Sequence, residues 1–329
     1  MLSSPDRVAL AITPTPLEPL PRLSRQHHLD LLIKRDDLTG AALTGNKVRK
    51  LEFLLAEAQA ERADTVITCG GVQSNHCRAT ALAARRPGLD SVLFLRVADP
   101  ANPPPIEGNV LLDKLAGADL RYITPVEYAD RKRVMDAAAR DLKALGKRPY
   151  LIPEGGSNAL GSWGYVRCVE ELAREMPPGN ATLVYAAGSG GTGAGLILGV
   201  KLLRLPWRVV GINVCDDRAY FVKTIGEIVE QAIAQFSLAI PFARSEIEII
   251  DGYVGDGYAK SRPVELRLIA EVARTEGVIL DPVYTGKAFF GMTRELERHP
   301  RSLGERIVFI HTGGIFGLFP KAAELSAIF

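Results

Sequence analysis

One lysine in the sequence lies where amine chemistry is possible. In the segment TGNKVRK (44–50), Lys47 follows a glycine-containing turn at the predicted start of a helix. The partial positive charge of a helix N-terminus disfavours a second positive charge, so the pKa of this ammonium is expected to be lowered. A neutral amine can condense with a carbonyl group and later act as a base. The alternative is an exposed lysine without a chemical role, which is the commoner fate of lysine.

Three glycine-rich turns are expected between a strand and the helix that follows it. They are CGGVQSNH (69–76), EGGSNALG (154–161) and AGSGGTGAG (187–195). Backbone N–H groups that gather at the start of a helix favour an anion. The third turn also has the GxGxxG spacing of a dinucleotide-binding fingerprint, at Gly188, Gly190 and Gly193,. Its acidic partner would be Asp216, which lies somewhat beyond the usual distance, and close packing of helix against strand explains such glycines equally well,.

Together, these features are the parts of a site for pyridoxal phosphate. An amine can form an imine with the cofactor, the GSGGTG turn (188–193) can hold its phosphate, and the SNH turn (74–76) offers polar groups,. The ring of this cofactor is an electron sink for carbanions. A nicotinamide-dependent dehydrogenase is an alternative, but it leaves Lys47 and the SNH turn without a role. A third alternative is a cofactor-binding protein with little turnover, because side chains misplaced by an ångström lose activity.

The elements that must position these residues are typical of an α/β fold. Short β-branched runs alternate with longer helical segments, which predicts mostly parallel sheets with helices on both faces. Strands are predicted at 31–34, 65–68, 91–96, 120–124, 150–153, 182–187, 208–214, 247–250 and 306–311. Helices are predicted at 46–63, 74–85, 126–144, 157–175, 191–203, 218–235, 263–276 and 287–297. The proline-rich segment 98–109 is predicted to be a loop,.

Composition excludes several classes of partner. The chain has 329 residues, with 40 Lys and Arg against 38 Asp and Glu, so its net charge of +2 gives no field that would attract nucleic acid or a membrane surface,. Four cysteines without a CxxC pair predict neither a disulfide framework nor a metal site,. The first 16 residues lack the apolar core of a secretory signal, and the apolar run at 193–205 contains Lys201 and Arg204,. A cytoplasmic protein with a small-molecule partner is therefore expected.

Nine blocks of the sequence occur in the order of a known family. They are TPTPLEPLPRLS (13–24), IKRDDLTG (33–40), GNKVRKLEFL (45–54), GGVQSNHCR (70–78), GNVLLDKLAGAD (108–119), IPEGGSNALGSWGYV (152–166), GSGGTGAGL (188–196), ARTEGVILDPVYTGKA (273–288) and HTGG (311–314). In these blocks the chain resembles the D-cysteine desulfhydrase and aminocyclopropane carboxylate deaminase family, pyridoxal-phosphate enzymes with a tryptophan synthase β-like fold. The resemblance implies two open, twisted, mostly parallel sheets and a homodimer. It also implies a small domain at 45–160, a large domain of 1–44 and 161–329, and a cofactor in the cleft between them.

The resemblance further implies how the cofactor is held. Lys47, in the GNK motif, would form the imine, whereas Lys50 would be structural. Asn75 would form a hydrogen bond with the ring hydroxyl of the cofactor. The turn from Gly188 would hold the phosphate through its backbone N–H groups. The cofactor-binding residues of this turn are Ser189, Gly190, Gly191 and Thr192, and Thr285 and Thr312 complete the expected set.

Substrate contacts are implied in the same way. Ser74, Asn75 and His76 would receive the substrate carboxylate at a helix N-terminus, and Tyr258 would contact the substrate. Tyr284 would face the reacting centre and tune proton transfer. The Cα proton would be removed by Lys47, Ser74 or Tyr284, and the sequence leaves this choice open.

Two positions favour one branch of the family. The deaminases have a glutamate near the pyridine nitrogen where this chain has Thr285, and a glutamine where it has His76. A hydroxyl keeps the ring a milder electron sink, which suits elimination of a good leaving group. The expected activity is therefore that of a D-cysteine desulfhydrase, which produces pyruvate, hydrogen sulfide and ammonia. Alternatives within the same chemistry are aminocyclopropane carboxylate deamination and elimination from another β-substituted amino acid such as cysteate.

Overall fold

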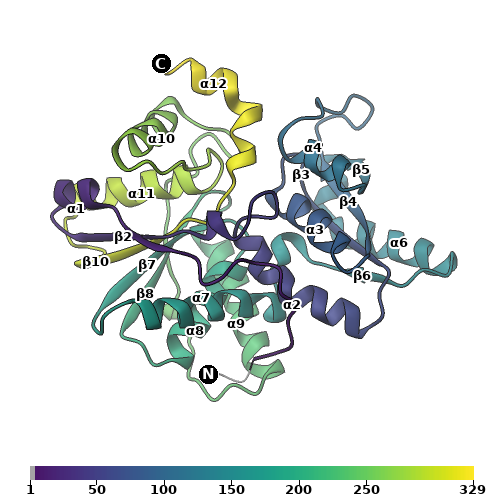
Figure 1. Ribbon diagram of the computed structural model, residues 1–329, viewed down its shortest axis with the longest axis horizontal. Coiled ribbons are helices and arrows are strands. Elements are labelled where there is room, and N and C mark those ends of the chain that lie inside the picture. Colours follow the sequence, from purple (N-terminus) through teal and green to yellow (C-terminus); the bar gives the residue numbers. More distant parts are fainter. Residues whose placement is uncertain (1–3) are drawn as a thin grey trace.

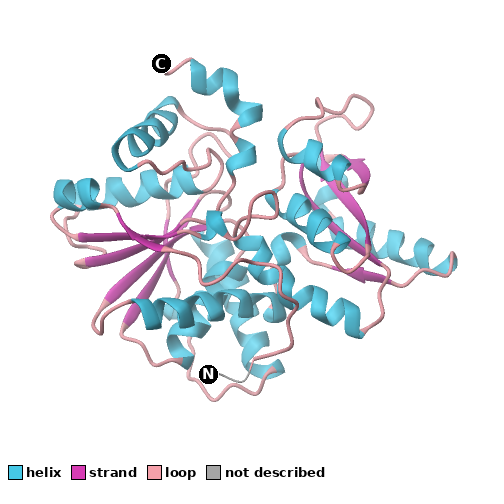
Figure 2. Cartoon of the chain, viewed as in Figure 1, coloured by secondary structure: helices cyan, strands magenta, loops and turns pink. Residues whose placement is uncertain are grey.

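The computed structural model describes residues 4–329, in which two β-sheets lie side by side and each is surrounded by helices (Figure 1, Figure 2). The larger sheet has the strand order β1-β2-β10-β7-β8-β9. Its strands are β1 (Leu17–Pro19), β2 (Asp30–Lys34), β7 (Ala181–Ala187), β8 (Trp207–Asn213), β9 (Glu248–Ile250) and β10 (Arg306–Ile310). Neighbouring strands pair in parallel, except that β1 is antiparallel to β2.

The smaller sheet is parallel throughout and has the order β5-β4-β3-β6. Its strands are β3 (Thr65–Gly71), β4 (Asp90–Arg96), β5 (Asp119–Ile123) and β6 (Pro149–Leu151). In the register of β3 and β4, Gly71 lies opposite Arg96 at the carboxyl ends of both strands.

Helices connect the strands and cover both sheets. The α-helices are α1 (Pro21–His27), α2 (Asn46–Ala60), α3 (Asn75–Arg85), α4 (Gly108–Leu115), α5 (Pro125–Ala129), α6 (Arg131–Ala144), α7 (Ala159–Glu175), α8 (Gly191–Leu202), α9 (Arg218–Gln235), α10 (Pro263–Glu276), α11 (Thr285–Arg298) and α12 (Ala322–Ser326). Short 3-10 turns are η1 (Asp36–Leu38), η2 (Glu154–Gly156), η3 (Arg244–Glu246), η4 (Ile315–Gly317) and η5 (Phe319–Lys321). No helix within residues 4–329 is long and apolar enough to cross a membrane.

Alternating side chains explain why both faces of each sheet are covered. In β7, Leu183 and Tyr185 belong to the core formed with α7, α8 and α9, whereas Val184 belongs to the core formed with α1, α10 and α11,. In β4, Phe94 packs on the α6 side and Leu93 on the α3 and α4 side. Such two-sided burial is typical of parallel sheets.

The predicted α/β class is confirmed, and all nine predicted strands are present with slightly shifted ends. The additional strand β1 was not predicted. The single helix predicted at 126–144 is wrong, because α5 and α6 are separated at Asp130, whose φ of −106° and ψ of 36° leave the helical region. The break places Arg131 Nε 2.9 Å from Glu154 Oε2 and its guanidinium over the Tyr128 ring.

Candidate active site

A cavity of about 1060 Å³ lies where the carboxyl ends of β3 and β7 lead into α3 and α8. Among the residues predicted for the site, its walls include Lys47, Ser74, Asn75, His76, Ser189, Gly190, Thr192, Tyr258, Tyr284 and Thr312. Segments far apart in the sequence thus meet at one place, as expected for ligand sites of open α/β sheets.

Lys47 occupies the second position of α2, after Gly45, whose φ of 94° favours glycine,. Its Nζ donates to Asn46 Oδ1 at 3.1 Å. Burial lowers the pKa of this ammonium to about 8, although Glu154 and Asp281 act in the opposite direction. The lowered pKa was predicted, but desolvation is its main cause rather than the helix terminus.

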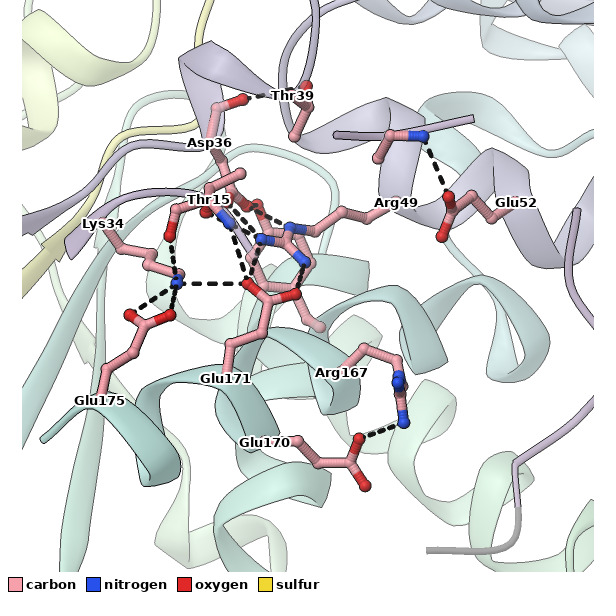
Figure 3. A network of polar contacts seen from close by, with 12 residues as sticks. Thr15, Lys34, Asp36, Thr39, Arg49, Glu52, Arg167, Glu170, Glu171 and Glu175 are labelled. Carbon is pink, nitrogen blue, oxygen red and sulfur yellow. Dashed lines mark hydrogen bonds and ion pairs between the residues drawn. The ribbon is translucent and has the colours of Figure 1, made fainter. Parts of the chain in front are cut away.

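A buried network of ion pairs anchors α2 two residues further on (Figure 3). Arg49 donates from Nε and Nη2 to Asp36 and from Nη1 and Nη2 to Glu171, at 2.8–2.9 Å. Lys34 extends the network from β2, with its Nζ 3.0 Å from Glu175 Oε2 and 3.2 Å from Glu171 Oε2. The network ties β2, η1 and α7 to the helix that carries Lys47, which fixes where that lysine enters the cavity.

Lys50, which was expected to be structural, lies beside two of the glycine-rich turns. Its side chain is fully buried, and Nζ donates to Gly155 O at 3.2 Å and Ser157 Oγ at 3.3 Å. No carboxylate in residues 4–329 pairs with it, and burial, together with the charge of Lys47, holds its pKa well below the ordinary value. A buried ammonium without an acidic partner is costly, so the amine either gives up its proton, as the lowered pKa indicates, or pairs with a bound anion,. The sequence did not predict these contacts, because Gly155 and Ser157 lie far from Lys50 along the chain.

The turn between β7 and α8 fits a phosphate group beside Lys50. Gly190 caps α8 with a φ of 83°, and a Cβ at Gly191 would lie 2.9 Å from Lys50 Nζ. The first N–H groups of a helix have no acceptor within the helix. Ser189 Oγ lies 3.0 Å from Ser157 Oγ, and Thr192 Oγ1 accepts a hydrogen bond from Asn46 Nδ2 at 3.2 Å. Backbone amides, hydroxyls and one amine therefore converge on a small space that side chains leave open.

The SNH turn forms the first turn of α3. Ser74 caps the helix, and its Oγ accepts from Cys77 N at 3.2 Å. Asn75 Oδ1 accepts from Asn109 Nδ2 at 3.0 Å. The buried His76 has Nε2 2.8 Å from Thr68 Oγ1, and burial, reinforced by Lys47 and Lys50, holds its pKa well below the ordinary value. A neutral His76 adds no charge to a carboxylate site, so backbone N–H groups would carry most of that contact.

Two tyrosines, Tyr258 beside Gly71 and Tyr284 beside Gly188, form another part of the wall. The hydroxyls of Tyr258 and Tyr284 lie 2.7 Å apart, and their rings meet edge to face. Burial raises the pKa of Tyr258 to about 12, and it raises the pKa of Tyr284 well above the ordinary value. Both hydroxyls therefore keep their protons near neutral pH. The Arg96 guanidinium lies over the rings of Tyr258 and Tyr128, at 5.3 and 4.6 Å from their centroids,.

The remaining predicted residues differ in their placement. Thr312 lines the cavity, and its carbonyl accepts from Asn46 N at 3.0 Å. Thr285 is fully buried outside the cavity lining, and its Oγ1 donates to Asp281 Oδ1 at 2.7 Å. The structure therefore does not bring the Thr285 hydroxyl together with the other predicted cofactor contacts. Asp281 also accepts from the backbone of Val283, Tyr284 and Thr285, so its carboxylate is engaged at the start of α11.

Comparison with known proteins agrees with this geometry. Residues 8–313 match the family model described as pyridoxal-phosphate dependent enzyme. A Thermotoga maritima protein whose name proposes 1-aminocyclopropane-1-carboxylate deaminase activity is 42% identical, over 97% of this chain and 99% of that protein. A bifunctional D-cysteine desulfhydrase/1-aminocyclopropane-1-carboxylate deaminase of Arabidopsis thaliana, named as mitochondrial, is 41% identical over 97% of this chain and 81% of its own length. A D-cysteine desulfhydrase of Salmonella choleraesuis is 38% identical over 95% of both chains.

Solved structures show the same fold. A crystal structure of an ACC deaminase homologue has a TM-score of 0.91 and 40% identity, and covers 99% of this chain and 97% of that one. Threonine deaminase isoform 2 from Solanum lycopersicum has a TM-score of 0.67 at 18% identity, over 97% of this chain and 84% of that one, which shows the fold alone. The dehydrogenase interpretation of the GxGxxG spacing is therefore wrong. The chain belongs to the family of pyridoxal-phosphate-dependent enzymes, among relatives named as ACC deaminases and D-cysteine desulfhydrases.

Proposed function

We propose that the protein is a D-cysteine desulfhydrase, which converts D-cysteine to pyruvate, hydrogen sulfide and ammonia. The observation that carries this choice is the absence of a free carboxylate at the start of α11, within the described residues. Thr285 stands where the deaminases of the resembling family have a glutamate, and the nearby Asp281 is held by four hydrogen bonds. A ring nitrogen without a carboxylate partner makes a milder electron sink, which suits elimination of a good leaving group.

Binding would use the convergent groups of the cavity. The Gly188–Thr192 turn and Lys50 would hold the phosphate, and the Asn75 amide would face the ring hydroxyl. The N-terminus of α3, at Ser74 and His76, would receive the substrate carboxylate. When bound, pyridoxal phosphate supplies the electron-accepting ring that makes the Cα proton of an amino acid removable.

The proton transfers can be divided between Lys47 and Tyr284. With a pKa of about 8, the Lys47 amine is partly neutral near neutral pH and can take the Cα proton,. Tyr284 has a raised pKa and keeps its proton, so it is suited to donate a hydrogen bond to the departing sulfur rather than to act as the base, and the sulfur leaves as hydrosulfide,. Ser74 Oγ already accepts from Cys77 N, which makes it a poor base. The Cβ–S electron pair leaves with the sulfur, and released 2-aminoacrylate takes up water to give pyruvate and ammonia.

A second candidate is elimination from an amino acid with an anionic β-substituent, such as cysteate. The observation in its favour is Arg96, which lines the cavity over Tyr258 but has no carboxylate partner in the described part of the chain. An unpaired guanidinium would recognise a sulfonate better than a thiol. Replacing Arg96 by Met separates the candidates, because it would weaken turnover of cysteate far more than turnover of D-cysteine.

The decisive experiment combines a visible absorption spectrum with product assays. The purified protein should show the absorption band of a lysine imine, and the substitution Lys47→Ala should abolish it. Addition of D-cysteine should then release pyruvate and sulfide in equal amounts. A band without sulfide would move the substrate to cysteate or aminocyclopropane carboxylate. A band without turnover of any of the three would leave a cofactor-binding protein, and both results would contradict the proposed activity.

We further propose the domain division of 45–160 against 1–44 and 161–329, with the site between them, and a homodimer. The strands of the smaller sheet all lie between residues 65 and 151, which supports the division.

Exposed apolar side chains on α4 and on the segment from η4 to η5 support an interface between two copies of the chain. They are Leu111, Leu115, Ile315 and Phe319. Light scattering during gel filtration tests the dimer, and a monomeric mass would contradict it.

A further inference from the structure

Asn109 is a fully buried polar residue of α4 that the proposed chemistry does not use directly. Its Oδ1 accepts from Arg78 Nε at 3.0 Å. Its Nδ2 donates to Gln73 O and to Asn75 Oδ1, both at 3.0 Å. All of its side-chain donors are therefore in use, and they link α4 to the turn that begins α3.

The direction of these hydrogen bonds follows from chemistry alone. Arginine has only donors, so the Asn109 atom that faces Arg78 must be the amide oxygen. A backbone carbonyl only accepts, so the atom that faces Gln73 O must be the amide nitrogen. These two constraints agree, and they leave an N–H of Asn109 directed at Asn75. The Asn75 atom at that contact must then be its amide oxygen, which turns its NH2 group away from Asn109.

Arg78, which donates to Asn109, also contacts the segment before Lys47. Its Nη2 donates to Thr44 O at 3.0 Å and its Nη1 donates to Ala42 O. One buried guanidinium thus forms hydrogen bonds both with the backbone that precedes Lys47 and with the Asn109 amide that contacts Asn75. Asn75 itself lines the cavity.

We propose that Arg78 and Asn109 are positioning residues, which orient the Asn75 amide so that its NH2 group, and not its carbonyl, faces the bound cofactor. The inference rests on the proposed placement of the cofactor's ring hydroxyl against Asn75. A donor at this place stabilises the ionised ring oxygen, whereas an acceptor favours the protonated oxygen.

The substitution Asn109→Asp tests the proposal, because it replaces the N–H that Asn109 directs at Asn75 with an acceptor. The new carboxylate would pair with Arg78 and present only acceptors to Asn75, so the Asn75 amide would rotate and turn its carbonyl toward the cofactor. The pH titration of the cofactor's absorption bands in the holoenzyme should then shift upward by about one to two units, as expected for losing one hydrogen bond to a charged group. Asn180→Asp, at an exposed position, is the matched control and should leave the titration unchanged.

A double substitution separates orientation from general structural damage. In an Asn75→Ala background, Asn109→Asp should cause no further shift, because the amide that it reorients is gone. The substitution Asn109→Ser removes the side-chain amide without adding a charge, and it replaces Asn109→Asp if the aspartate variant does not fold. It should shift the titration less than Asn109→Asp when Asn75 is present, and it should not shift the titration in the Asn75→Ala background. The proposal would be overturned if Asn109→Asp shifted the titration equally with and without Asn75, or if it caused no shift when Asn75 is present. If Asn75→Ala alone leaves the titration unchanged, the placement of the ring against Asn75 fails instead.

Discussion

Three basic residues on one turn of α2, Lys47, Arg49 and Lys50, have different surroundings. Arg49 is enclosed by Asp36 and Glu171, and every contact of its guanidinium is with a protein acceptor (Figure 3). Lys47 lines the cavity, and Lys50 lies behind its wall against Gly155 and Ser157. Burial lowers the pKa values of both amines, and no carboxylate of residues 4–329 forms an ion pair with either. A buried cation with a complete set of partners serves the fold, whereas a buried cation without them marks a place for a ligand.

Arg49 is expected to contribute most to the stability of the fold. We expect Arg49→Met to lower the free energy of unfolding of the apoprotein by about 3–5 kcal/mol, because it leaves the fully buried Asp36 carboxylate without its charge partner,. Urea unfolding measures the change. Lys132→Met, in the exposed pair with Asp136, is the control and should have far less effect, since surface pairs contribute little,. Equal effects of the two substitutions would show that the network is not what holds α2.

The substitution Lys50→Met is expected to affect cofactor binding but not the stability of the fold. The apoprotein should be as stable as the native protein or more stable, because a buried amine without an acidic partner is removed,. The affinity for pyridoxal phosphate should fall about 10- to 100-fold, as expected for one hydrogen bond to a charged group. Fluorescence titration measures the affinity of the native protein and of the variant for pyridoxal phosphate. Pyridoxal, which lacks the phosphate, is the control ligand, and an equal loss of its affinity would contradict a phosphate contact.

Of the residues on this turn of α2, the sequence alone could identify Lys47 but not the surroundings of Lys50. Lys47 was identifiable because its neighbours in the chain, Gly45 and Asn46, mark a turn at a helix start. The glycine turns were identifiable for the same reason. Lys50 resembles any helical lysine in sequence, because its contacts with Gly155 and Ser157 exist only after folding.

Other misses have the same origin in tertiary contacts. The break at Asp130 brings Arg131 to Glu154, a contact between segments that helical periodicity does not reveal. Thr285 stands next to Tyr284 in sequence, yet its hydroxyl faces Asp281 because the start of α11 is built around that carboxylate. Local patterns thus predicted most of the elements and the residues at turns, whereas β1, α1, α4, α12 and the directions of buried polar side chains required the structure.

The smallest effect that we predict concerns the pH dependence of Lys47. Only the neutral amine attacks an aldehyde, so imine formation by the apoprotein should be slow below the pKa of about 8 and level off above it,. Between pH 7 and pH 9 the rate should rise about tenfold, whereas a lysine with an ordinary pKa near 10.4 would give a rate that still climbs about tenfold per unit at pH 9. Stopped-flow absorbance with pyridoxal phosphate measures the profile. Because Glu154 raises the pKa of Lys47, Glu154→Gln should move the midpoint to lower pH, and a midpoint that moves upward would contradict this account of the charges around the amine,.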